Sequence, residues 1–344
     1  MAKSIRERPV GSGSAGLGVR ERVRNREEES KSKSKRRAIE RNGKGCCHHL
    51  TSTDIRQAGR ECVYRCRKEE ITVSSWNSAL MIIDIHTHAF PDALAERAVS
   101  TLSAVAQVPT HSDGTCEGLR RSQQIAGIAL SVIAPIATKP AQARAINAWA
   151  AEVNRHYDDL LCFGSLHPAQ QDWAEEIARL VEDGIRGVKF HADYQDFFVD
   201  EPRVLPIYRA LAGAGLIVLF HAGVDIGLPP PVHCPPARLA HVLDAVPELV
   251  AIASHMGGYA QWTEVKVCLL GRDLYFDTSY SLADLGAEHM TALIQGHGAH
   301  RVLFGTDSPW TDQVAEVGHI GALPLSDEEK AAILGENARG LLGR

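Results

Sequence analysis

Residues 82–88 of this chain read Ile82-Ile83-Asp84-Ile85-His86-Thr87-His88, an apolar run that ends in two histidines. Side chains alternate between the two faces of a β-strand, so His86 and His88 project to the same side and can bind one cation. The chain has 16 histidines, so such a pair can also arise by chance. The pair suggests a metalloenzyme, and motifs elsewhere in the sequence are needed to test this interpretation.

Four later segments repeat the arrangement of a short apolar run followed by a residue that can bind a metal or transfer a proton. They are Val188–His191, Leu219–Gly223, Ile252–Gly258 and Leu303–Pro309, and they contribute Lys189, His221, His255 and Asp307. Buried parallel strands read as such apolar runs, and α/β folds bind their ligands at the carboxyl ends of these strands. The repetition therefore favours one shared site at the strand ends.

Strand and helix patterns alternate from Met81 onward. We expect strands at 82–85, 127–133, 161–165, 187–190, 216–220, 249–253, 274–277 and 302–305, and helices at 141–156, 173–183, 203–212, 236–245, 287–295 and 327–342. Eight such units in a segment of this length match a (β/α)₈ barrel, which has about 250 residues. An open doubly wound sheet is the alternative, but no glycine-rich phosphate loop follows an early strand. The pattern predicts a TIM barrel over residues 81–344.

The segment before the barrel has a different composition. The chain's 37 basic residues divide into 19 in residues 1–80 and 18 after them, and its 42 acidic residues divide into 10 and 32. With few large apolar residues, residues 1–80 cannot bury enough surface to offset chain entropy, so we expect a disordered basic extension. The alternative is that the functional chain starts at Met81 and the extension is a start-site artefact.

The composition also limits the partners and the compartment. The basic extension lacks interleaved aromatic residues and carries Glu27-Glu28-Glu29, so it does not favour a nucleic-acid partner. No apolar run is long enough to span a membrane, and no apolar signal-peptide core is present. Cys116, Cys162, Cys234 and Cys268 show no disulfide framework spacing. We therefore expect a cytoplasmic enzyme with a small-molecule substrate, and a homodimer as the default assembly.

The order of these motifs resembles a known family. His-Thr-His after the first strand, His221 after the fifth, His255-Met-Gly-Gly after the sixth and Gly-Thr-Asp307-Ser-Pro after the eighth are similar to the amidohydrolase superfamily. The resemblance is to its amidohydrolase-2 branch, which includes the aminocarboxymuconate semialdehyde decarboxylase-like proteins. It covers residues 81–344, including the ending Gly335-Glu336-Asn337-Ala338-Arg339.

The resemblance implies the roles of individual residues. His86, His88 and His221 correspond to metal ligands, and Asp307 to the fourth ligand and a proton acceptor. His255 corresponds to the catalytic histidine. Three imidazoles and one carboxylate suit Zn²⁺, with Mn²⁺ or Fe²⁺ as substitutes.

Lys189 and His191, after the fourth strand, allow several interpretations. Lys189 could bind a substrate carboxylate, bridge two metals as a carbamate as in binuclear branches of the superfamily, or pack inside the barrel. His191 could donate to substrate or be an ordinary polar residue at a strand end. Two sets of residues could wall the pocket, namely the proline-rich segment 228–236 and the aromatic residues Tyr280 and Trp310, although a rigid connector and core packing explain them equally well.

Three functions fit these residues. The first is a metal-dependent hydrolase that attacks an ester, lactone or amide with metal-activated water. The complete His86/His88 pair favours it, because several decarboxylases of the branch have an acidic residue in place of the first histidine. The second is a metal-dependent decarboxylase of an unsaturated or aromatic carboxylic acid, since the semialdehyde decarboxylases retain that histidine. The third is a non-catalytic binding barrel, which an intact ligand set disfavours.

Overall fold

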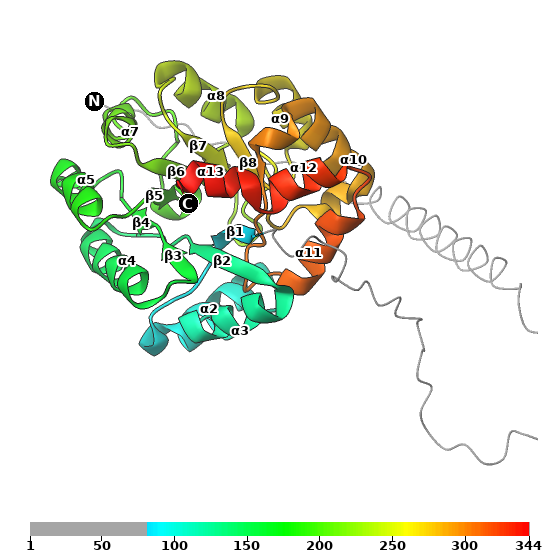
Figure 1. Cartoon of the computed structure of the whole chain (residues 1–344). Helices are drawn as coiled ribbons and strands as arrows, with labels where there is room; N and C mark the ends of the chain where they lie inside the picture. Colours follow the sequence, from blue (N-terminus) through cyan, green and yellow to red (C-terminus); the bar gives the residue numbers. More distant parts are fainter. Residues whose placement is uncertain (1–80, 344) are drawn as a thin grey trace, which may run out of the picture. The chain divides into compact units, whose positions relative to one another are not determined.

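A computed structural model describes residues 81–343, in which parallel strands form a ring surrounded by helices (Figure 1). The strands are β1 (Ile82–Thr87), β2 (Ile128–Ile133), β3 (Leu160–Cys162), β4 (Gly164–Ser165), β5 (Gly187–Phe190), β6 (Ile217–Phe220), β7 (Ala251–Ala253), β8 (Tyr275–Asp277) and β9 (Val302–Leu303). Each of the eight expected strands is present. The expected strand at 161–165 is divided at Phe163 into β3 and β4.

Backbone hydrogen bonds close the ring at its two discontinuities. Strands β1–β3 pair in one sheet and β4–β9 in another, all in parallel. Between β9 and β1, the N–H of Ile85 donates to the carbonyl of Phe304 at 2.9 Å, and the N–H of Phe163 continues the ladder of β2 by donating to Ile133 at 2.9 Å. The (β/α)₈ barrel is thus confirmed, and the open sheet is excluded.

The helices form the outer layer. They are α2 (Asp92–Ala106), α3 (Cys116–Ala126), η2 (Pro140–Gln142), α4 (Ala143–His156), α5 (Trp173–Glu182), α6 (Ala192–Gln195), α7 (Leu205–Gly213), α8 (Pro236–Ala245), α9 (Trp262–Cys268), α10 (Leu282–His297), η3 (Ala299–Arg301), α11 (Gln313–Ala322), α12 (Asp327–Ala331), η4 (Ala332–Glu336) and α13 (Asn337–Leu342). The expected helices all have counterparts, whereas the sequence patterns missed α2, α3, α6, α9 and α11.

Strand alternation divides the core into an inner and an outer layer. On β6, Ile217 and Leu219 pack inside the barrel, whereas Val218 and Phe220 pack against the helices. On β5, Val188 faces the helices in the same way, which places the next residue, Lys189, on the inward side. The inner layer also includes Ala338 and Leu342 of α13, so the C-terminal helix covers one end of the barrel. The opposite end is left for a ligand.

The prediction for residues 1–80 lies outside the residues that the structure describes. Among the helices of residues 81–343, none is both long enough and apolar enough to cross a membrane.

Candidate active site

A cavity of about 660 Å³ lies at the carboxyl ends of the strands. All the candidate residues predicted from the sequence line it, namely His86, His88, Lys189, His191, His221, His255 and Asp307. They come from β1 and β5 and from the segments that follow β1, β5, β6, β7 and β9. The barrel thus brings together side chains that lie up to 221 positions apart, from His86 to Asp307.

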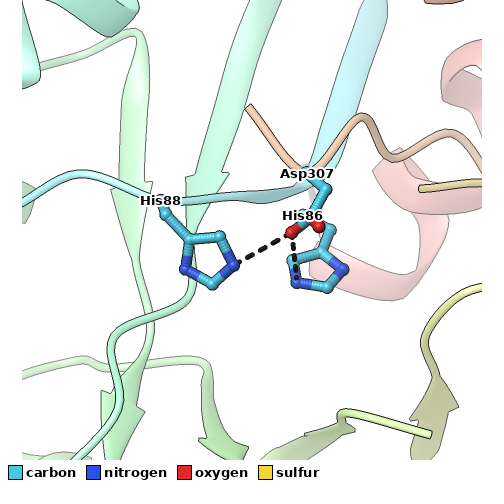
Figure 2. Close-up of side chains that lie close together, drawn as sticks. All are labelled: His86, His88 and Asp307. Atoms are coloured by element: carbon cyan, nitrogen blue, oxygen red, sulfur yellow. Dashed lines mark hydrogen bonds and ion pairs between the residues drawn. The ribbon is translucent and has the colours of Figure 1, made fainter. Parts of the chain in front are cut away.

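His86, His88 and Asp307 form a compact group that could hold a metal ion (Figure 2). Oδ1 of Asp307 lies 3.0 Å from Nε2 of His88 and 3.5 Å from Nε2 of His86. A tetrahedral ion with metal–nitrogen distances of about 2.0–2.1 Å has edges of about 3.4 Å between its ligand atoms. The group therefore fits a divalent transition metal without large rearrangement.

Asp277, which the sequence interpretation missed, fixes the orientation of His86. Oδ2 of Asp277 accepts from Nδ1 of His86 at 3.0 Å, so the proton is on Nδ1 and Nε2 keeps its lone pair. Burial, followed by the charge of Lys189, lowers the pKa of His86 to about 4. Burial alone would raise the pKa of Asp277, but the charge and hydrogen bond of His86 outweigh it and hold that pKa well below its usual range. A neutral imidazole beside a carboxylate is the usual state of a metal-binding histidine.

A second chain of hydrogen bonds fixes the tautomer of His221. The carbonyl of Ser279 can only accept, so Nδ1 of His255 donates to it at 3.0 Å and Nε2 of His255 is left to accept. Nδ1 of His221 lies 3.1 Å from that Nε2 and must be its donor. Nε2 of His221 then carries a lone pair, and it is buried without a hydrogen-bond partner among the described residues. Burial, with the charges of His191 and His255, holds the pKa of His221 well below its usual range.

His221 also belongs to a second group of potential ligands, with His191 and Asp225. The rings of His191 and His221 stack with their centroids 4.0 Å apart, and Nε2 of His191 lies 3.1 Å from Oδ2 of Asp225. The family-based ligand set of four residues is thus divided between two neighbouring groups. Nothing in the sequence around Asp225, which follows β6 by five residues, distinguishes it from a loop carboxylate.

Lys189 reaches the first group from β5. Its Nζ lies 3.1 Å from Nε2 of His86 and donates to Oγ of Ser254 at 3.2 Å. Burial lowers the pKa of Lys189 to about 8. The side chain is fully buried in protein but lines the cavity, so it combines packing with access to a ligand.

Asp84, also missed from the sequence, joins β1 to the segment after β9. It accepts from the backbone N–H of Thr306 at 3.0 Å and from Nε2 of Gln313 at 2.8 Å. Burial raises the pKa of Asp84 to about 7. These bonds hold the backbone next to Asp307. The φ angles of Asp307 (+66°) and of His255 (+59°) both lie in the left-handed region. Such strained backbone in non-glycine residues tends to cluster at functional sites.

The remaining walls of the cavity are mostly apolar. Tyr280 and Trp310 line it as one interpretation of the sequence had it, but the proline-rich segment 228–236 does not. Val224 and Ile226, directly before that segment, take its place, together with side chains of α2 and α4.

Comparisons with known proteins place this geometry in context. The family model described as Amidohydrolase matches residues 83–344. A search of curated proteins returned no match.

Solved structures share the fold at low sequence identity. An uncharacterised TIM-barrel protein from Bordetella bronchiseptica is 21% identical with a TM-score of 0.62, covering 77% of this chain and 100% of that one. The 5-carboxyvanillate decarboxylase of Sphingomonas paucimobilis is 16% identical with a TM-score of 0.58, covering 77% and 99%. A dihydroxybenzoic acid decarboxylase of Polaromonas sp., solved with manganese and 2-nitroresorcinol, is 17% identical with a TM-score of 0.59, covering 76% and 97%.

Proposed function

Because the chain belongs to the amidohydrolase family whose model it matches over residues 83–344, we propose that it is a metal-dependent decarboxylase of an unsaturated or aromatic carboxylic acid. The observation that carries this proposal is the composition of the cavity. One end is rich in histidine and carboxylate side chains, and the remaining walls are mostly apolar. Such a cavity suits a substrate with one charged head and an apolar body that leaves as a neutral product. The decarboxylases among the similar structures support the same choice and reverse the preference for hydrolysis drawn from the sequence.

The ligands proposed for the metal are His86, His88, His221 and Asp307. Nε2 of His86 and Nε2 of His88 converge on one carboxylate oxygen, and the unpaired Nε2 of His221 is buried at the same cavity, an arrangement that fits a divalent ion. This donor set suits Zn²⁺, and the manganese in the Polaromonas structure makes Mn²⁺ an equal candidate. When bound, the ion would act as a Lewis acid for negative charge on a substrate oxygen.

The chain's own residues would bind the substrate and stabilise its charge. We assign the ammonium of Lys189 to the substrate carboxylate, because it is buried at the cavity end where that group must lie. His255 lines the same end of the cavity. Its Nδ1 donates to the carbonyl of Ser279 and its Nε2 accepts from His221, so we assign to it the positioning of His221.

Asp307 would supply the proton that the reaction consumes. When the carbon–carboxylate bond breaks, CO₂ leaves and the electron pair stays on carbon, so one proton must be delivered there. Burial alone would raise the pKa of Asp307, but the hydrogen bond of His88 and the charge of His86 outweigh it and hold that pKa well below its usual range. Asp307 is therefore ionised at rest, and it would first take a proton from water or from an acidic group of the substrate and then deliver it to carbon.

The proposal is tested by measuring both products of the two candidate reactions. The metal-loaded full-length protein is incubated with aromatic and unsaturated carboxylic acids, and separately with lactones, esters and amides, in ¹⁸O-labelled water. We expect CO₂ release without incorporation of ¹⁸O into the organic product. Incorporation of ¹⁸O with no CO₂ release would instead establish hydrolysis, the second candidate, which the complete His86/His88 pair favours. If the protein binds no transition metal tightly, the third interpretation, a non-catalytic binding barrel, would be supported instead.

Cysteine usage bears on the compartment. Among residues 81–343, Cys116, Cys162 and Cys234 are buried and Cys268 is partly buried, and these four form no disulfide with one another. Free thiols are typical of reducing compartments, which supports our proposal that the enzyme is cytoplasmic.

A further inference from the structure

The cavity continues from the proposed metal site into a groove between α2 and the η2–α4 segment. From α2 it is lined by Leu94, Ala98, Leu102 and Ala106, and from η2 and α4 by Ala141, Ala145, Ile146 and Trp149. Leu94, Ala98, Leu102 and Ala106 recur at intervals of four, as do Ala141, Ala145 and Trp149, with Ile146 beside them, so each wall is one apolar stripe along a helical segment. We call this feature the α2–α4 groove.

The two stripes are distinct from the buried faces of the helices. On α2 the buried residues are Ala95 and Val99, and on α4 the buried residues include Ala143, Ala150 and Val153. The groove residues lie on the adjacent faces, where Leu94 is 44% exposed and Ala145 is also exposed. Exposed apolar surface that continues into a catalytic cavity indicates a ligand site rather than leftover core.

The composition of the groove indicates what it binds. Four of its eight helical residues are alanine, which leaves room between the helices, and the indole of Trp149 supplies a flat apolar surface. Ile226, from the segment after β6, is 45% exposed and adds apolar surface to the same cavity. Apart from Gln142 and Thr138, the groove offers few side chains that can form hydrogen bonds.

We propose that the α2–α4 groove binds a hydrophobic tail of the substrate, an extended alkyl or aryl-alkyl group attached to the head that reaches His86, His88 and Asp307. The nature of the head rests on the proposed function, whereas the tail rests on the groove alone. The full cavity of about 660 Å³ lies within the range of about 300–1,000 Å³ that encloses drug-sized ligands, so it has space for more than a single carboxylated ring.

Binding of straight-chain ligands to the full-length protein tests this proposal by calorimetry. One series is carboxylates from butanoate to decanoate, and a second is primary alcohols of the same lengths, which lack the acidic head. Burial of each methylene contributes about 0.8 kcal/mol, so affinity should rise about fourfold per carbon until the groove is filled. Equal affinity along both series would overturn the proposal. A length dependence in the alcohols, together with no decarboxylation of the aromatic and unsaturated acids used to test the proposed function, would uphold the groove and reject the proposed reaction.

Matched variants locate the binding surface. In Ala145→Phe the new ring would occupy the groove, so the gain with chain length should be lost while butanoate binds as before. Ala148→Phe places the same ring on an exposed position of α4 that does not line the cavity and should behave like the parent. Ala98→Phe and Ala104→Phe repeat the comparison on α2, should a variant of α4 fail to fold. Equal effects of groove and control variants, or a change of oligomeric state confined to the groove variants, would show that the groove does not hold a substrate tail.

Discussion

Replacing Asp277 by asparagine should weaken metal binding although Asp277 is not a proposed ligand. Oδ1 of Asp277 accepts from the backbone N–H groups of His255 and Ser279, at 3.0 Å and 3.1 Å, and from the hydroxyl of Ser279. Because these donors require an oxygen, the NH₂ group of the introduced amide would have to face Nδ1 of His86. Two donors cannot pair, so His86 would move its proton to Nε2 and lose the lone pair that faces the ion.

The expected size of the effect follows from the role of such partners. Loss of a hydrogen-bonded carboxylate behind a metal-binding histidine typically lowers metal affinity about 10- to 100-fold, or about 1.4–2.7 kcal/mol. We expect the upper part of this range, because the amide opposes the required tautomer instead of merely leaving it unsupported. Competition with a chelator of known affinity measures the change. Asp273→Asn, at a 90% exposed carboxylate near the start of the same strand, is the control.

The thermal midpoint of the metal-free proteins separates this effect from misfolding. If Asp277→Asn folds and binds metal as tightly as the parent, the tautomer argument is wrong and His86 is not a ligand through Nε2.

Three further predictions concern the ligands, the cavity lysine and the barrel interior. His221→Ala should lose most bound metal whereas His191→Ala retains one ion per chain in elemental analysis; loss in both would place the ion in the second group. Since Lys189 has a pKa of about 8, it is charged below that pH, so kcat/KM for a carboxylate substrate should fall as pH rises through about 8, and Lys189→Met should remove this step. Leu219→Ala, inside the barrel, should destabilise by about 2–5 kcal/mol in urea unfolding, far more than Leu94→Ala at the exposed groove.

The sequence was sufficient for the barrel and for the residues around its mouth because both depend on local signals. A strand such as β6 is an apolar run that ends at a polar residue, and parallel strands bring those ends together whatever lies between them. Helix α2 was missed because its 15 residues are rich in alanine and carry two apolar stripes, a buried one with Ala95 and Val99 and one that lines the groove. With two apolar stripes, the sequence lacks the single apolar face by which an amphipathic helix is recognised.

Asp277 and Asp84 show what sequence patterns cannot supply. Asp277 ends β8 as other polar residues end their strands, and only its distance of 3.0 Å from a histidine 191 positions away gives it a role. Asp84 interrupts an apolar strand, which is a detectable anomaly, but its partners Thr306 and Gln313 lie more than 200 positions along the chain. Contacts of this kind exist only once the barrel has closed.

The position of His221 between two groups favours one metal ion rather than two. Its Nδ1 is committed to His255, so Nε2 is the only nitrogen that it can offer an ion. In the second group, His191 and Asp225 already satisfy one another as a donor and acceptor 3.1 Å apart, an arrangement that is complete without a cation. In the first group, two imidazole nitrogens face one carboxylate oxygen, and Nε2 of His86 is the acceptor for Lys189 rather than a donor. His88 and Asp307 also pair, at 3.0 Å, so the first group differs from the second by its additional imidazole, and we propose that Nε2 of His86 and the unpaired Nε2 of His221 hold a single ion there.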